Sequence, residues 1–229
     1  MSAPFRRQFA LLFGKDALLL GRRAAAFISI VFFTLLVVII FQFGIDLEGR
    51  SPVPYACPFI WLGSLFGGML RMSRTFEADM RGKALDGIRL VKGVFLPLYL
   101  SKLLFNIVFM IVLELLMFIV VVALFNVPDP LLYLRAAWVP FVLGAIGFSA
   151  IGTTFSGMVL GETSKDLMLP VIAYPILSPL VIGVVKSLEY DPSGMKVFLN
   201  LSWIYLLLAF DLIYVVLSLT VFDVLLESH

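Results

Sequence analysis

The sequence has few of the residues that usually carry covalent or metal chemistry. Its 229 residues include one cysteine, Cys57, and one histidine, His229. This count excludes a disulfide within the chain and a Cys/His metal cluster built by the chain alone. A G-x-x-x-x-G-K-[ST] loop is also missing, because Gly82-Lys83 lacks the upstream glycine and the following hydroxyl that cradle phosphates. We therefore expect any ATP hydrolysis to belong to a partner.

Charged residues are scarce too, and apolar residues take their place. Charged residues make up 14% of the sequence, hydrophobic residues make up 62%, and the mean hydropathy is +1.08. Soluble domains contain about 25% charged and about 45–50% apolar residues. The composition predicts an all-α integral membrane protein, with one transmembrane domain over residues 1–229.

Six apolar runs have about the length that a membrane-spanning helix needs, roughly 20 residues. They cover residues 24–44, 58–72, 98–125, 136–160, 167–185 and 199–226. The second run is short, and its helix is expected to begin near Tyr55. Pro170, Pro175 and Pro179 lie in the fifth run and predict a kinked or broken helix.

Lys and Arg are unevenly distributed between the two sides of the predicted spans. One side holds Arg6, Arg7, Lys15, Arg22, Arg23, Arg71, Arg74, Arg81, Lys83, Arg89, Lys92 and Lys165. The other side holds only Arg50, Arg135, Lys186 and Lys196. Because cytoplasmic loops are enriched in Lys and Arg, both termini and residues 71–92 are predicted to be cytoplasmic. Lys102 falls near the cytoplasmic start of the third span, where its long stem is expected to snorkel to the interface.

Residues 1–23, MSAPFRRQFALLFGKDALLLGRR, form a basic leader before the first span. The apolar run that follows is about twenty residues long, whereas the core of a signal peptide has 7–15. Apolar residues recur in the leader at helical spacing, and most of its basic residues lie elsewhere on the helix. This pattern favours an amphipathic helix in the cytoplasmic interface. A basic stub that only enforces the topology is the alternative.

Residues 71–92, RMSRTFEADMRGKALDGIRLVK, place nine charged residues between two apolar runs. Phe76, Met80 and Ile88 fall near one helical face, and Leu85 lies at its edge. The charged residues that occupy much of the remaining surface are Glu77, Asp79, Arg81 and Asp86. Glycines at 82 and 87 favour two short helical pieces with a bend. The pattern predicts either a helix that docks on a partner protein or a solvated loop whose charges only fix topology.

A longer pattern runs through this segment and both neighbouring spans. It consists of Trp61, Phe76, Asp79, Leu85, Asp86, Ile88 and Lys102. This pattern resembles the cytochrome c maturation protein B family, also described as haem exporter protein B (CcmB). In that family a Trp in the second span precedes a cytoplasmic F-x-x-D-x-x-D-G-x-L-E-x-L segment, and a Lys opens the third span. Here Asp86 replaces the Glu and Ile88 the second Leu, while Gly82-Lys83 stands in place of Asp-Gly.

The resemblance implies a permease subunit of an ATP-binding cassette (ABC) transporter in the bacterial inner membrane, with the ABC-2-type exporter architecture. It implies two copies of this subunit, two cytoplasmic ATPase subunits, a haem-handling membrane protein and a periplasmic haem chaperone. Haem is then the expected cargo, and ATP acts through the partner. The residues expected to couple to the ATPase are Phe76, Glu77, Asp79, Arg81, Leu85, Asp86 and Ile88. On this basis, charge reversal at Asp79 or Asp86 is expected to release the ATPase.

Ionisable residues within the spans form a second set of candidates, because each is costly unless it faces protein or water. Glu114 lies near the middle of the third span and either lines a substrate or coupling path or locks two helices together. Asp211 is expected to pair with Lys102 or with another polar group. The small residues of the fourth span, from Gly144 to Gly152, predict tight packing within the subunit or a dimer interface.

Three classes of function remain open from the sequence. The first is an ABC permease for cytochrome c maturation, and the second is the same architecture with a drug, lipid or polysaccharide cargo. The third is an assembly factor that uses ATPase motion to remodel a membrane partner without transport. No catalytic residue, metal site or directly bound cofactor is assigned, and haem ligation is expected elsewhere in the complex. Membrane lipid is an expected partner, and nucleic acid is not.

Overall fold

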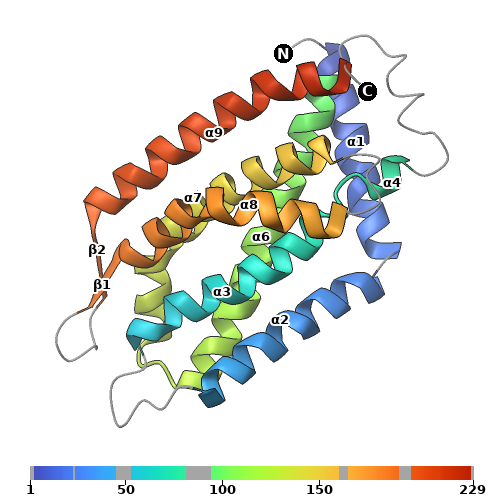
Figure 1. The fold of residues 1–229 in the computed structure, drawn as a ribbon. Helices are drawn as coiled ribbons and strands as arrows, with labels where there is room; N and C mark the ends of the chain where they lie inside the picture. The colour runs from blue at the N-terminus through green and yellow to red at the C-terminus, as the bar shows by residue number, and fades with distance from the viewer. Residues whose placement is uncertain are drawn as a thin grey trace.

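The structure is a computed structural model that describes residues 3–22, 24–44, 53–80, 94–159, 165–190 and 197–227. Within these ranges the chain forms eight helices and a pair of short strands (Figure 1). In chain order they are α1 (Ala3–Arg22), α2 (Ala24–Gly44), α3 (Val53–Met72), α4 (Glu77–Met80), α6 (Phe95–Phe125), α7 (Pro130–Met158), α8 (Lys165–Lys186), β1 (Leu188–Tyr190), β2 (Val197–Leu199) and α9 (Leu201–Glu227).

Five helices in the described ranges are long and apolar enough to cross a membrane. They are α3, α6, α7, residues Met168–Lys186 of α8 and residues Leu201–Val221 of α9. The corresponding stretch of α2, Ile28–Gly44, is shorter, although the helix itself covers the predicted 24–44. The structure thus supports a helical, multi-pass membrane protein, and the sixth crossing stays a prediction.

Two helices differ from the sequence prediction for local reasons. α7 begins at Pro130 rather than at residue 136, because proline fits the first helical position and Asp129 before it has a φ of 48°. α8 runs from Lys165 to Lys186 as one helix with three prolines inside it, so the predicted break is wrong. In α8 the Ser178 hydroxyl donates a hydrogen bond of 2.8 Å to the Pro175 carbonyl, one of the acceptors beside these prolines.

α6 is the longest element, with 31 residues. At ~1.5 Å per residue it is about 46 Å long, well beyond the roughly 30 Å of a bilayer's hydrocarbon core. It ends where Asn126 adopts a left-handed conformation, with φ of 48°, and its N–H bonds back to the Val122 carbonyl. One end of α6 therefore has to lie outside the hydrocarbon or the helix has to tilt.

Figure 1 shows α2 and α9 on opposite flanks, with α3, α6, α7 and α8 between them. α3 packs on α2 and α6, and α7 packs on α6, α8 and α9. The core between these helices contains large, fully buried side chains such as Trp61, Met110, Met117 and Phe148. The leader helix α1 lies beside α6 and makes fewer contacts with α2.

Glycines in α7 allow close packing within the subunit. A Cβ atom on Gly144 would lie 2.1 Å from the Trp61 ring, and one on Gly147 would lie 2.4 Å from Asp211 Oδ1. Gly152 faces the Met72 side chain in the same way. The small residues of the fourth span therefore serve contacts inside this chain, which is the first of the two readings open from the sequence.

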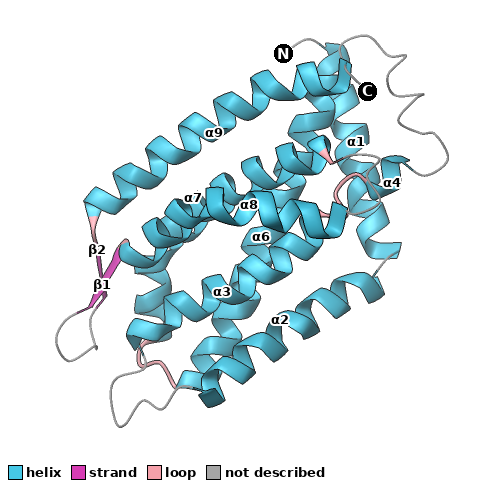
Figure 2. Cartoon of the chain, viewed as in Figure 1, coloured by secondary structure: helices cyan, strands magenta, loops and turns pink. Residues whose placement is uncertain are grey.

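The segment between α8 and α9 contains a small antiparallel hairpin (Figure 2). Glu189 of β1 lies opposite Phe198 of β2 at its centre. The hydroxyl of Tyr190 lies 3.3 Å from that of Tyr133, which ties the hairpin to the start of α7. Each strand has only three residues, which is too few for the alternation of apolar and polar residues that indicates a strand.

Candidate functional site

A buried group of four charged side chains joins three parts of the chain. α1 contributes Lys15 and Asp16, α4 contributes Asp79, and α6 contributes Lys102. Lys102 Nζ lies 2.8 Å from Asp16 Oδ1 and 2.6 Å from Asp79 Oδ2. Lys15 forms an ion pair with the other oxygen of Asp79. We refer to these four residues as the ionic cluster.

The ionic cluster is shielded from solvent on most sides. The side chain of Asp79 is 0% exposed and that of Lys102 is 2% exposed, while Lys15 at the edge is 36% exposed. The Lys102 ammonium also lies 5.6 Å from the centroid of the Phe76 ring, a cation–π distance. Two cations and two carboxylates give the cluster no formal net charge, so each buried charge has a partner.

Asp79 is the member whose ionisation is best defined. Burial raises the pKa of its carboxyl, but the ammonium groups of Lys102 and Lys15 outweigh burial and hold the pKa below its usual value. Asp79 is therefore a carboxylate at neutral pH. It joins the leader to α6 from the middle of the charged segment.

Hydrogen bonds fix the same segment to the transmembrane helices. Asn106 of α6 donates to the hydroxyls of Thr75 and Thr153, over 3.3 Å and 2.9 Å. The Ser156 hydroxyl of α7 donates to the Met72 carbonyl over 2.7 Å. Residues 72–79 are thus attached to α1, α6 and α7 before the segment leaves the described residues at 81.

These contacts correct two predictions for Lys102. Its stem does not snorkel to the surface, because α1 and α4 bring carboxylates to the ammonium inside the protein. The expected pair between Lys102 and Asp211 is also wrong, because the carboxylate partners of the Lys102 ammonium are Asp16 and Asp79. Asp211 instead lies against Gly147, and neither of its carboxyl oxygens has a hydrogen-bond partner among the described residues.

The seven coupling residues divide between interior, surface and undescribed positions. Phe76 and Asp79 are buried, with exposures of 2% and 0%, so both face the chain's own interior. Glu77 is half-buried. The other four, Arg81, Leu85, Asp86 and Ile88, lie outside the described residues, as do Gly82 and Lys83.

Glu114 lies near the middle of α6 with 1% exposure, and neither of its oxygens has a hydrogen-bond partner among the described residues. It lies close enough to Cys57 of α3 for the two groups to interact electrostatically. In the part of the chain that the structure describes, no group of three or more His, Cys, Asp and Glu residues is placed to hold a metal ion.

Comparison with known proteins now places the chain in a family. The model of the family described as CcmB protein matches residues 7–225. The chain belongs to the CcmB family. A curated relative, heme exporter protein B of Rhodobacter capsulatus, is 25% identical over 203 residues, which cover 81% of this chain and 84% of the relative. The resemblance seen in the sequence is therefore confirmed.

The CcmB match contains all four residues of the ionic cluster. Sequence reasoning identified Asp79 and Lys102 but treated Lys15 as a topology signal and did not weigh Asp16. One signal was available, because Asp16 is the only acidic residue in the leader and directly follows a lysine. In this CcmB chain the leader helix thus supplies two of the four residues of the ionic cluster.

Proposed function

We propose that this CcmB-family chain is the transmembrane permease subunit of an ABC complex for cytochrome c biogenesis. Family membership over residues 7–225 and the printed name of the Rhodobacter relative, heme exporter protein B, support this proposal. The observation that carries the mechanism is the ionic cluster, which fastens the start of the charged segment to α1 and α6. ATP hydrolysis then comes from a separate cytoplasmic subunit, two copies of which serve two copies of this chain.

The buried position of Asp79 indicates that the residues of the charged segment have two different roles. Phe76 and Asp79 anchor the segment to the membrane domain, and the residues that meet the ATPase are Glu77, Arg81, Leu85, Asp86 and Ile88. A displacement of the segment by the ATPase then reaches α1 and α6 through the Asp79 carboxylate. Because a buried ion pair is costly to break, the segment and the two helices move together.

The complete topology belongs to the same proposal. α2 supplies the sixth crossing of the inner membrane, both termini lie in the cytoplasm, and the β1–β2 hairpin lies on the periplasmic side. The twelve-to-four distribution of Lys and Arg supports this orientation. The hairpin then faces the side on which a haem-handling membrane protein and a periplasmic haem chaperone act.

Charge reversal at Asp86 tests the coupling. Asp86→Lys is expected to lose the co-purifying ATPase. The substitution puts a positive charge in place of a rim carboxylate that sets the register of docking, so the new side chain repels the partner surface that Asp86 attracted. Glu189→Lys is the matched control, since Glu189 is exposed on β1 at the proposed periplasmic end and is expected to keep the ATPase. Both variants are compared by affinity purification and by their gel-filtration profiles. A normal yield of ATPase with Asp86→Lys contradicts the coupling.

A transport assay decides what the ATPase motion accomplishes. Vesicles that contain the purified complex are loaded with haem on the ATPase side and supplied with ATP. Haem appearing on the opposite side identifies haem as the cargo. Release of a haem-loaded chaperone without haem transfer identifies the complex as a release machine. If ATP is hydrolysed but haem neither crosses nor leaves on the chaperone, a role in haem delivery is contradicted.

A further inference from the structure

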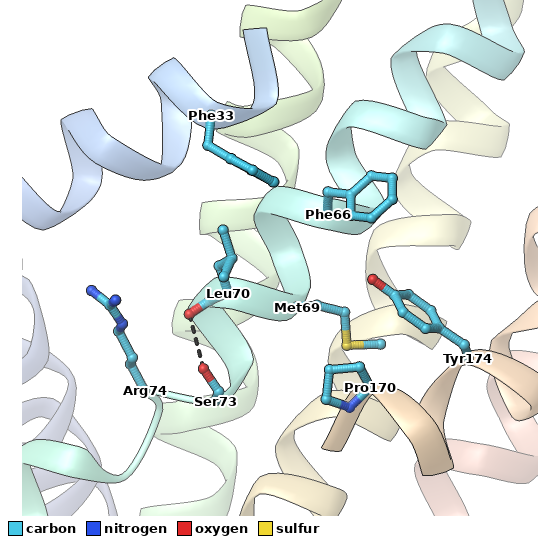
Figure 3. A pocket seen from close by; sticks show the side chains of 8 residues that line it. All are labelled: Phe33, Phe66, Met69, Leu70, Ser73, Arg74, Pro170 and Tyr174. Atoms are coloured by element: carbon cyan, nitrogen blue, oxygen red, sulfur yellow. Dashed lines mark hydrogen bonds between the residues drawn. The ribbon is translucent and has the colours of Figure 1, made fainter. Parts of the chain in front are cut away.

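A pocket of about 240 Å³ opens between α2, α3 and α8, beside the end of α3 (Figure 3). None of the residues that line the pocket belongs to the ionic cluster, so the two sites are separate. The pocket is partly open to the surface. Its position, where α3 ends and α8 begins, places it at one membrane boundary.

Aromatic rings from three helices form the walls of this pocket. The Phe66 ring of α3 lies 6.4 Å from that of Phe33 on α2 and 6.5 Å from that of Tyr174 on α8, and both contacts are edge-on. Contacts of this geometry are favourable for aromatic pairs and hold the rings in place. The apolar part of the pocket is therefore formed before any ligand enters.

A single cation lies at the other end. Figure 3 shows Arg74 and Ser73 at the end of the pocket away from Phe66 and Tyr174. Arg74 is exposed, and its guanidinium makes no ion pair with a described residue. The Ser73 hydroxyl already donates its hydrogen to the Leu70 carbonyl over 3.2 Å. Arg74 is therefore the donor that a ligand anion would meet, and guanidinium groups bind phosphate well.

The size of the pocket limits the kind of ligand. Pockets that enclose drug-sized molecules have volumes of about 300–1,000 Å³, whereas this one has about 240 Å³ and is open on one side. A ligand here keeps part of its length outside the pocket. The neighbouring surfaces of α2 and α8 are apolar and exposed, as at Phe32 and Val171, so the rest of the ligand lies along a surface that faces lipid.

We propose that this pocket is a binding site for one anionic phospholipid. The phosphate pairs with Arg74, and the upper part of one acyl chain lies against Phe33, Phe66 and Tyr174. An anionic lipid is favoured over a zwitterionic one because Arg74 has no carboxylate partner to offset its charge among the described residues. The topology proposed above assigns the lipid to the cytoplasmic leaflet, whose surface is negatively charged. The binding itself does not depend on an ATPase.

Native mass spectrometry of the full-length chain in detergent tests the proposal, with phosphatidylglycerol and phosphatidylcholine as probes. The wild type is expected to bind one phosphatidylglycerol about tenfold more tightly than phosphatidylcholine. Both lipids carry the phosphate, but the quaternary ammonium of phosphatidylcholine offsets the phosphate charge and is repelled by Arg74. Arg74→Gln is expected to remove this preference, and Arg74→Lys is expected to keep most of it. Arg6→Gln is the matched control, since Arg6 is an exposed arginine on the same predicted side.

A second variant tests the apolar walls without changing charge. Leu70→Trp places a large ring at the pocket and is expected to weaken phosphatidylglycerol binding although Arg74 remains. Equal effects of Arg6→Gln and Arg74→Gln, or equal affinity of the wild type for both lipids, would overturn the proposal. So would haem that binds in an Arg74-dependent way and displaces the lipid. Loss of ATPase association leaves these binding results unchanged, so the two proposals fail separately.

Discussion

Two regions of this protein bury charge-bearing groups in opposite ways. In the ionic cluster, Lys102 is buried and has two carboxylate partners. Farther along the same helix, Glu114 is equally buried, yet its carboxyl oxygens have no hydrogen-bond partner among the described residues. Burial alone is thus a poor guide to the state of an ionisable side chain. A buried charge with partners costs far less than a buried polar group that has none.

The largest effect is expected from removing the central cation of the cluster. Lys102→Met leaves Asp16 and Asp79 facing one lysine, and breaking a buried ion pair costs about 3–5 kcal/mol. Denaturant unfolding of the purified chain in detergent measures this loss. Lys186→Met, at the exposed end of α8, is the control with the same chemical change. Adding Asp16→Asn to Lys102→Met is expected to restore part of the stability, because Lys15 and Asp79 remain as a balanced pair; no restoration argues against pairing as the cause.

A smaller effect is expected from acid. The pKa of Asp79 in the folded chain lies below that of an ordinary aspartate, which is about 3.9. Its ionisation therefore contributes stability that is present above pH ~4 and is lost as the pH falls through the folded pKa. Thermal unfolding between pH 6 and pH 3 is the measurement. The melting temperature of Asp79→Asn is expected to be lower than that of the wild type at pH 6 and to fall less between pH 6 and pH 3. If the melting temperatures of the two proteins fall in parallel, the stabilising ionisation does not belong to Asp79.

The smallest effect is expected at Glu114. Glu114→Gln is nearly isosteric and removes no counter-charge, so the free energy of unfolding is expected to change by less than about 1.5 kcal/mol. Asp79→Asn makes the same change from carboxyl to carboxamide inside the ionic cluster and is expected to cost more. Unfolding of the two variants under identical conditions compares the regions directly. A larger loss at Glu114 would show that this carboxyl is charged and paired in the assembled protein.

The spans were predictable because their signal is local. A run of about twenty apolar residues specifies a membrane helix without reference to the rest of the chain, and five of the six predicted runs meet this criterion in the structure. Helix ends were less predictable. The start of α7 at Pro130 depends on the left-handed Asp129 before it, which no apolar count reveals.

The ionic cluster was only half predictable because its signal is not local. Asp79 and Lys102 stood out as polar residues beside apolar runs, but their partners in the leader are separated from them by 64 and 86 residues. This large separation along the sequence also explains why the predicted pair of Lys102 with Asp211 was wrong. The carboxylate of Asp16 comes from α1, outside the predicted spans.

The distance along the chain between Asp16 and Lys102 also sets a waiting time during synthesis. The two residues are 86 positions apart, and ribosomes add roughly 5–20 residues per second, so Asp16 precedes its partner by on the order of 4–17 seconds. During this interval the leader has no α6 to pack against. Its amphipathic pattern suits that period, because an interfacial helix can rest at the membrane surface with its charges in water. The two descriptions of residues 1–23, as interfacial helix and as packed helix, then belong to successive stages in the life of one nascent chain.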